Sequence, residues 1–247
     1  MPRFFVEAAA ITEGEDGVLR VHVAGSDADH ITRSLRMHPG DSLTVCDMAR
    51  REYSCEIESV GSLVTARVVS EKASLSEPPY IAVLYQALVK GDKFDTVVQK
   101  AVECGVSVIV PVLTERCTVR PDGKGIQNKL ARWRRIAAEA AGQCGRGIMP
   151  EVRDMLTFSE AVKEGGKTDR PLFCYEGDGT KPLPEVLGSE VPGSVSLMIG
   201  PEGGFSAEEV KKAEEAGMTA VGLGRRILRT ETASSFVLAC LSYAYEL

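Results

Sequence analysis

The stretch LMIGPEGGFSAEEV, residues 197–210, ends a short apolar run in a glycine-rich loop. Gly200 is followed by a proline, a glutamate and two more glycines, and Ser206 stands three residues before Glu209. This serine–glutamate spacing is typical of a capping box, so we expect a helix to begin at Ser206. The loop from Gly200 to Phe205 then joins a buried strand to a helix, which is where open α/β sheets bind ligands.

Residues 220–233, AVGLGRRILRTETA, repeat this arrangement. A short strand ends at glycines, and either Thr230 or Thr232 is placed to cap the helix that follows. If the two strands are neighbours in the sheet, their loops form one pocket with Arg229 and Glu231 at its mouth. Spacing alone leaves open the alternative that both loops are ordinary turns.

The first loop does not have the composition of a phosphate-binding loop. The sequence contains neither GxxxxGKS/T nor GxGxxG, and the loop supplies no lysine. Glu202, Glu208 and Glu209 crowd the helix start and would compete with an anion for its positive end. A neutral or cationic ligand, held by backbone groups that the glycines leave accessible, fits better.

The whole chain has 247 residues, of which 44% are hydrophobic and 26% charged, as in ordinary globular proteins. No apolar run approaches the roughly 20 residues that span a bilayer, so no membrane association is expected. The N-terminus, MPRFFVEAAA, has no signal-peptide pattern and is expected to belong to the mature protein. Seven cysteines without a CxxC pair favour reduced thiols in a cytoplasmic protein over disulfides or zinc.

Two domains are predicted. Residues 1–72 contain about five short runs rich in Val, Leu, Phe, Tyr and Thr, separated by turn signals, which indicates a small β-barrel. Residues 74–79, SLSEPP, form the expected linker. In residues 78–247 apolar strand-like runs alternate with amphipathic helical segments, which predicts an α/β fold with a mostly parallel sheet.

Charge is distributed unevenly in this acidic chain, whose net charge is −6. Residues 1–77 carry 8 basic and 13 acidic side chains, whereas residues 86–153 carry 12 basic and 7 acidic ones. The second region therefore predicts a basic face that could meet a polyanion, with a solvated helix surface as the alternative.

Several motifs, taken together, resemble one family across nearly the whole chain. The paired motifs IGPEGGFS and LGRRILRTETA are accompanied by MPRFF at 1–5, HITRSLRMHPGD at 30–41, LVKGDKFDTVVQKAVECGV at 88–106, TERC at 114–117 and RWRRIAAEAAGQCGR at 132–146. Their content and order are similar to those of the bacterial small-subunit rRNA uridine-N3 methyltransferases, the RsmE family of the SPOUT superfamily.

The resemblance implies a fold and a chemistry. It implies an N-terminal barrel similar to the PUA RNA-binding domain, and a C-terminal α/β domain threaded as a deep trefoil knot, a rare exception to unknotted topology. It further implies a homodimer that binds S-adenosylmethionine in the knot, without a metal, and methylates one uridine in the decoding region of 16S rRNA. The cationic sulfonium of this cofactor suits the glycine-rich loop and its carboxylate.

The resemblance also implies site residues. Those expected to bind the cofactor are Ile199, Gly200, Pro201, Glu202, Gly203, Gly204, Leu223, Gly224, Ile227, Leu228 and Arg229. Uridine N3 must lose a proton, so Arg229 is the candidate for stabilising the uracil anion, and Glu231 and Glu202 are the candidate bases. An equally good explanation of Glu231 is an acid that favours the helix dipole.

Candidate RNA contacts are Arg3, Arg33, Arg36, Lys90, Lys93, Arg116 and Arg146, each of which could instead form a surface salt bridge. Trp133 is a candidate for stacking on a base or, with more weight, for packing inside the protein. Three alternative functions remain: a 2′-O-ribose methyltransferase of the same superfamily, a non-catalytic RNA-binding or ribosome-assembly protein, and a nucleotide-phosphate enzyme, which the missing phosphate-loop lysine disfavours.

Overall fold

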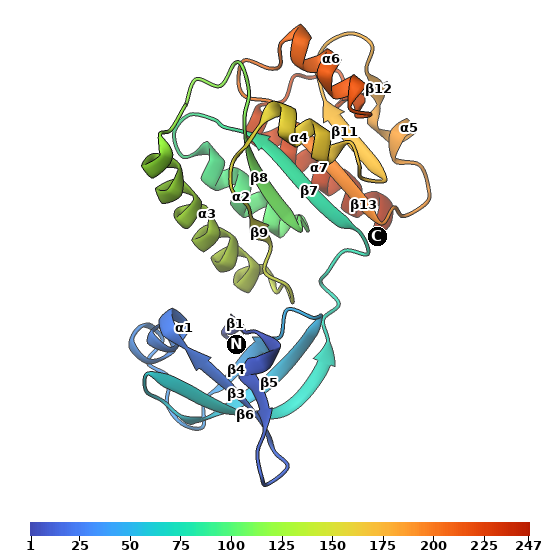
Figure 1. Ribbon diagram of the computed structural model, residues 1–247. Helices are drawn as coiled ribbons and strands as arrows, with labels where there is room; N and C mark the ends of the chain where they lie inside the picture. Colours follow the sequence, from blue (N-terminus) through green and yellow to red (C-terminus); the bar gives the residue numbers. More distant parts are fainter. The chain divides into compact units, whose positions relative to one another are not determined.

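The computed structural model describes all residues, 1–247, and divides into two compact units (Figure 1). The first unit comprises Met1–Glu77 and Ala141–Met149, and the second comprises Pro78–Ala140 and Pro150–Leu247. The change of unit after Glu77 lies in the stretch expected to be a linker. The return of residues 141–149 to the first unit was not indicated by the sequence.

The first unit is built on one curved six-stranded sheet (Figure 1). Its strands are β1 (Arg3–Phe5), β2 (Ile11–Glu13), β3 (Leu19–Ala24), β4 (Ser42–Cys46), β5 (Arg51–Ser59) and β6 (Leu63–Ala73). They are arranged in the order β1-β4-β5-β6-β3-β2, and only the β1–β4 pair is parallel. The strands enclose an apolar core that includes Val21, Leu43, Ile57 and Val64, none of which is exposed to solvent.

Three short helical turns complete this unit: η1 (Ala8–Ala10), α1 (Gly25–Asp29) and the π-helical turn η2 (His30–Ser34). α1 and η2 form a helical insert between β3 and β4, and Ile31 of η2 is fully buried in the core of this unit.

Residues 141–149 are held in the first unit by a buried ion pair. The Nη2 atom of Arg146 lies 2.6 Å from Oε2 of Glu77, and each side chain is only 4% exposed. Glu77 also accepts hydrogen bonds from the backbone N–H groups of Gly147 (2.9 Å) and Ile148 (3.1 Å). Burial opposes ionisation of Glu77, but the Arg146 hydrogen bonds prevail and lower the pKa of this carboxyl below its ordinary value.

The second unit contains one parallel sheet, as the alternating strand and helix patterns predicted. Its strands are β7 (Ile81–Ala87), β8 (Val108–Leu113), β9 (Glu151–Val152), β10 (Leu156–Thr157), β11 (Arg170–Cys174), β12 (Lys181–Pro182), β13 (Ser194–Ile199) and β14 (Thr219–Gly222). They lie in the order β10-β8-β7-β13-β11-β14-β12, with β9 paired to β8, and every pair is parallel.

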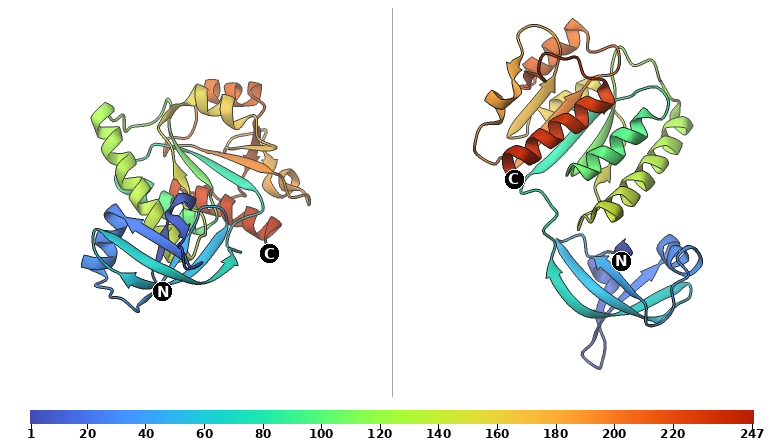
Figure 2. Two further views of the ribbon diagram at one scale, coloured as in Figure 1. Left: turned by 60° about the horizontal axis from the view of Figure 1, so that its bottom comes forward. Right: turned by 180° about the vertical axis from the view of Figure 1, so that it is seen from behind.

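Helices cover both faces of this sheet (Figures 1 and 2). They are α2 (Lys93–Glu103), α3 (Gly123–Cys144), α4 (Phe158–Gly165), α5 (Leu183–Leu187), α6 (Ala207–Glu215) and α7 (Thr230–Tyr245). α4 and α6 pack on one face through residues such as Phe158, Val162 and Ala213. α2 and α7 contact each other on the opposite face. Burial on both faces explains why the central strands are continuous apolar runs rather than alternating ones.

The strand order determines where the two glycine loops meet. Along the chain β11 is followed by β13 and then by β14, yet in the sheet β11 lies between β13 and β14. Because all three strands run in the same direction, their carboxyl ends meet at one edge. The loops that follow β13 and β14 therefore lie on either side of the end of β11.

Candidate functional site

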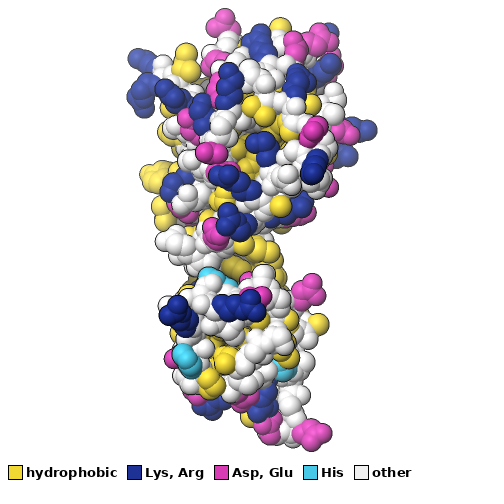
Figure 3. Space-filling view, turned by 90° about the vertical axis from the view of Figure 1, so that its left-hand side faces the viewer, with side chains coloured by type: hydrophobic (Ala, Val, Ile, Leu, Met, Phe, Trp, Pro, Cys, Tyr) yellow, Lys and Arg dark blue, Asp and Glu magenta, His cyan; other side chains and the backbone are white.

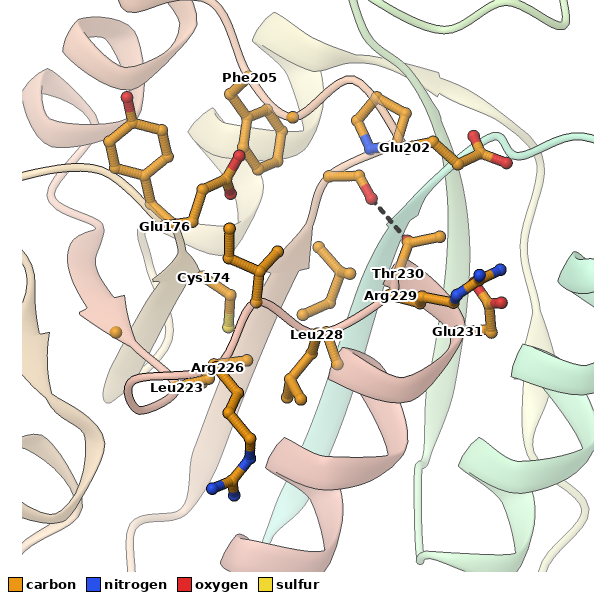
Figure 4. A pocket seen from close by; sticks show the side chains of 18 of the residues that line it. Cys174, Glu176, Glu202, Phe205, Leu223, Arg226, Leu228, Arg229, Thr230 and Glu231 are labelled. Carbon is orange, nitrogen blue, oxygen red and sulfur yellow. Dashed lines mark hydrogen bonds between the residues drawn. The ribbon is translucent and has the colours of Figure 1, made fainter.

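A single pocket of about 520 Å³ opens at the carboxyl ends of β11, β13 and β14 (Figure 4). Of the residues predicted to bind a cofactor, those that line it are Ile199, Gly200, Pro201, Glu202, Gly204, Leu223, Gly224, Ile227, Leu228 and Arg229. The exception is Gly203. The two loops thus form one pocket rather than two separate turns. The end of β11 supplies a third wall, including Cys174 and Glu176, that sequence reasoning did not identify.

Gly203 lies against a neighbouring side chain outside the pocket. A Cβ atom at this position would stand 3.3 Å from Cβ of Arg116. The Nη1 atom of Arg116 donates to the Gly203 carbonyl oxygen at 3.0 Å. Gly204 is the glycine that the loop conformation requires, because its φ is +64° and a Cβ there would lie 2.6 Å from Oε1 of Glu176.

The helix after the first loop begins as predicted. Ser206 and Glu209 form a capping box, in which the N–H of Glu209 donates to Oγ of Ser206 (3.3 Å) and the N–H of Ser206 donates to Oε2 of Glu209 (3.0 Å). The second oxygen of Glu209 accepts the N–H of Glu115 at 2.8 Å. The buried Glu209 carboxylate therefore holds backbone in place.

The second loop ends differently from the prediction. The cap of α7 is Arg229, without a side-chain capping bond, so neither Thr230 nor Thr232 caps the helix. Thr230 is the first helical residue, and its hydroxyl donates to the carbonyl oxygen of Gly200 at 2.6 Å (Figure 4). The same hydroxyl accepts from Nε2 of Gln86 at 2.9 Å. Thr230 therefore ties the two glycine loops to each other and to the end of β7.

Glu202 is occupied by an ion pair. Its Oε1 accepts from Nζ of Lys93 at 2.9 Å and from the backbone N–H of Lys90 at 3.3 Å. Partial burial disfavours the charge on Glu202, but these donors prevail and lower the pKa of its carboxyl. Lys93, predicted to contact RNA, lines the pocket instead and is engaged in this pair.

Glu231, in contrast to Glu202, has a carboxylate oxygen that no donor in the protein reaches. It lines the pocket from the first turn of α7, and its Oε2 atom is buried without a hydrogen-bond partner. Arg229 is exposed, forms no ion pair, and lies on the same side of the pocket as Glu231 (Figure 4). Because a buried carboxylate oxygen without a donor is costly, this oxygen is available to accept a hydrogen bond from a ligand or a water molecule.

Two of the predicted RNA contacts have bonding partners within the first unit, where Arg3 is partly buried and Arg146 is buried. Arg3 donates to Oε2 of Glu52 (3.1 Å), to Sγ of Cys46 (2.9 Å) and to the carbonyl oxygen of Arg146 (3.2 Å). Arg146 is 3% exposed and paired with Glu77. Both guanidinium groups therefore have structural partners, and we leave them out of the RNA-binding surface proposed below.

The other predicted RNA contacts are exposed. Arg33 has a side chain 81% exposed and pairs with Asp29 at 3.3 Å. Arg36, with a φ of +52°, and Lys90 are also exposed. Trp133 is 2% exposed and stacks on Phe94 with ring centroids 4.0 Å apart, so it is a packing residue.

The pocket suits a cofactor that is part apolar and part cationic. Ile199, Leu223, Leu228 and Phe205 give it an apolar lining, and the unpartnered oxygen of Glu231 can accept a hydrogen bond from a donor or a cation. Four cations also line it: Lys93, Arg225, Arg226 and Arg229. The absence of a lysine noted in the sequence therefore holds for the first loop but not for the pocket as a whole. No cluster of three or more His, Cys, Asp or Glu side chains forms a candidate metal site, and no helix is long and apolar enough to cross a membrane.

Comparison with known proteins agrees with this architecture. Residues 76–242 match the family model of the RNA methyltransferase domain, and residues 23–68 match that of the RNA methyltransferase PUA domain. The ribosomal RNA small subunit methyltransferase E of Bacillus subtilis is 33% identical, covering 100% of this chain and 98% of the relative. The protein of that name from Synechocystis is 32% identical, covering 98% of this chain and 80% of the relative.

A solved structure extends the comparison. The ribosomal RNA small subunit methyltransferase E of Neisseria gonorrhoeae, bound to S-adenosyl methionine, is 30% identical, has a TM-score of 0.83, and covers 99% of this chain and 98% of that one. With the matched models and the full-length likeness to the curated relatives, the chain belongs to the ribosomal RNA small subunit methyltransferase E family, with an N-terminal PUA-like domain and a C-terminal RNA methyltransferase domain.

Proposed function

We propose that this protein transfers the methyl group of S-adenosylmethionine to N3 of one uridine in the decoding region of 16S rRNA, in the small ribosomal subunit. The observation that carries the proposal is the single pocket formed by the two glycine loops that Thr230 joins. The chain also belongs to a family whose member from Neisseria gonorrhoeae is bound to S-adenosyl methionine. A cytoplasmic location follows from such a substrate.

In this proposal the second unit is threaded as a deep trefoil knot of the SPOUT type. Support comes from the displaced strand order, in which β11 lies between β13 and β14, and from the bond that fastens the loop after β13 to the start of α7. A chain path traced from an experimental density map that proves unknotted would contradict this part of the proposal.

Cofactor binding is assigned to the two loops, without a metal ion. Backbone groups of the glycines and leucines hold the adenine, while Ile199 and Leu228 provide apolar contacts. The bound cofactor supplies an electrophilic methyl group on a positively charged sulfur. The side chain of Ile227 is 86% exposed, so it contributes chiefly through its backbone or to a surface outside the pocket.

Proton removal from uridine N3 is assigned to Glu231 rather than Glu202. Glu202 is held by Lys93 and by the Lys90 amide, whereas one oxygen of Glu231 has no partner. Glu231 lies in the first turn of α7 and lines the pocket, where its free oxygen can accept the proton. Arg229 beside it stabilises the negative charge that develops on a uracil carbonyl. Glu202 and Lys93 position the first loop.

A homodimer is the proposed assembly. The outward side of α7 carries Phe236 (38% exposed) and Tyr243 (77%), and Leu247 beyond it is 96% exposed. They line an apolar groove together with Leu183 and Leu187 of α5. A second copy of the chain would bury this surface. Val237 and Leu241 of the same helix are fully buried within the protomer itself.

Methyl transfer to unmodified 16S rRNA and to small subunits that contain it tests the proposed activity. Nucleoside mass mapping after digestion should yield N3-methyluridine at one position. A 2′-O-methylated nucleoside would instead support the ribose methyltransferase. Tight RNA and cofactor binding without transfer would support a non-catalytic role.

A further inference from the structure

The loop between β14 and α7 carries two arginines that nothing in the protein neutralises. Arg225 and Arg226 are exposed, and neither forms a hydrogen bond or an ion pair with another residue. Both line the pocket, and Arg226 points away from Thr230 and Glu202 (Figure 4). Glu176 also lines the pocket but pairs with neither of them.

The basic region 86–153 is different, because most of its positive charges are already paired. Lys and Arg side chains there are interleaved with Asp and Glu on the surface (Figure 3). Seven of the twelve basic side chains are paired: Arg132 with Asp95 and Asp92, Arg134 with Asp154, Arg135 with Glu139, Arg146 with Glu77, Arg153 with Glu164, Lys93 with Glu202 and Lys100 with Glu103. More than half of the positive charges in this region are thus paired with carboxylates.

An RNA phosphate gains more from an unpaired guanidinium than from a paired one. A paired arginine must give up or share its carboxylate partner before it can bind a phosphate, whereas an unpaired arginine has no partner to lose. In both cases phosphate binding is favoured because it releases the counterions of the RNA. A guanidinium can also bind phosphate through two parallel hydrogen bonds. Location adds a second reason, because the nucleotide whose base enters the pocket brings its own and its neighbours' phosphates to the pocket rim.

We infer that Arg225 and Arg226 bind the RNA phosphates that flank the target uridine, and that they, rather than the α3 face, are the main phosphate contacts of the second unit. The inference rests on the proposed function, since it concerns how the same pocket receives its RNA. These contacts hold the strand while the base is turned out of its stack. They do not choose the base, because phosphates carry no sequence information.

The test compares two double variants that remove equal charge. Arg225→Ala/Arg226→Ala removes the unpaired arginines, and Arg132→Ala/Arg135→Ala removes two paired arginines of α3, whose side chains are 53% and 70% exposed. Binding to protein-free 16S rRNA and to small subunits is measured over a range of salt concentrations. Methylation is measured as a function of RNA concentration.

For Arg225→Ala/Arg226→Ala we expect the salt dependence to become shallower: the magnitude of the slope of log affinity against log salt should decrease by about 1.4–1.8, the value for two lost phosphate contacts. The half-saturating RNA concentration should rise about tenfold or more. The control should alter affinity less than about threefold. Equal behaviour of the two double variants on both RNA probes would overturn the inference.

Two further outcomes would also overturn it. If binding to protein-free rRNA stays unchanged while binding to the subunit weakens, the arginines contact a ribosomal protein. If the slope is unchanged but sedimentation shows a weaker dimer, they contact the second copy. Failure of the wild-type protein to methylate any rRNA would refute the proposed function, and the salt slopes would still decide whether these arginines bind RNA.

Discussion

Thr230→Val should loosen the pocket while preserving the shape of the side chain. Valine keeps the branched volume of threonine but removes its hydroxyl, which donates to the Gly200 carbonyl at 2.6 Å and accepts from Gln86 at 2.9 Å. Thr230 is 7% exposed and Gln86 is fully buried, so water cannot readily replace either bond. Leaving a buried polar group unpaired costs about 1–3 kcal/mol.

Gln86 keeps one hydrogen bond, because its Nε2 also donates to the Ala87 carbonyl at 3.2 Å. We therefore expect a total loss of about 3 kcal/mol in the free energy of unfolding. In a chain of this length each kcal/mol lowers Tm by about 2–4 °C, so Tm should fall by roughly 6–12 °C. Affinity for S-adenosylmethionine should fall as well, because the two loops would no longer be held together.

Thermal unfolding and calorimetric titration with the cofactor provide the measurements. Thr230→Ser, which keeps the hydroxyl, should restore most of the stability and the affinity. Thr232→Val is the matched control, since Thr232 is exposed in the same helical turn and its effect should stay within about 0.5 kcal/mol. The reasoning is refuted if Thr230→Val melts and binds the cofactor like Thr232→Val.

Three other substitutions have defined outcomes. Glu231→Gln should lower kcat at saturating RNA and cofactor by about a hundredfold or more, whereas Glu202→Gln should mainly weaken cofactor binding; equal losses of kcat would contradict the choice of base. Because the pKa of Glu77 is lowered in the folded state, its ionised form stabilises the protein above the ordinary carboxyl value of 4.5 and this contribution is lost as the pH falls through the lowered pKa. Denaturant unfolding of Glu77→Gln should accordingly show a large loss of stability at pH 7 and a smaller one near pH 3, and a loss independent of pH would exclude this linkage. If the proposed dimer forms through α7, Phe236→Glu/Tyr243→Glu should give monomers in light scattering at micromolar concentration, where the unaltered protein gives dimers, and an unchanged dimer mass would count against α7 as the interface.

Local features of the sequence predicted much of the second unit. The capping box at Ser206, the apolar runs of the central strands and the amphipathic helical segments between them depend on neighbouring residues, and the structure confirms them. That the two glycine loops share a pocket was also expected, but the premise that their strands are neighbours was wrong, because β11 lies between β13 and β14.

Contacts between residues distant in the sequence could not be predicted in this way. Thr230 had the composition of a helix cap, but its hydroxyl bonds to Gly200, thirty positions away. Counting charges likewise could not reveal that Lys93 is paired with Glu202. Arg146 was predicted to contact RNA from the surface, and only its burial beside Glu77 shows that it holds residues 141–149 in the first unit.

The ion pair between Arg146 and Glu77 also affects when the first unit can fold during synthesis. Its sheet is complete at Ala73, but the guanidinium that neutralises Glu77 is added about seventy residues later. A nascent chain that ends before Arg146 therefore holds a carboxylate that must remain hydrated, and the final packing around it awaits translation of the segment through Met149. The two units are consequently interleaved in translation order, and a ribosome-bound intermediate truncated at residue 77 would carry an unfinished first unit.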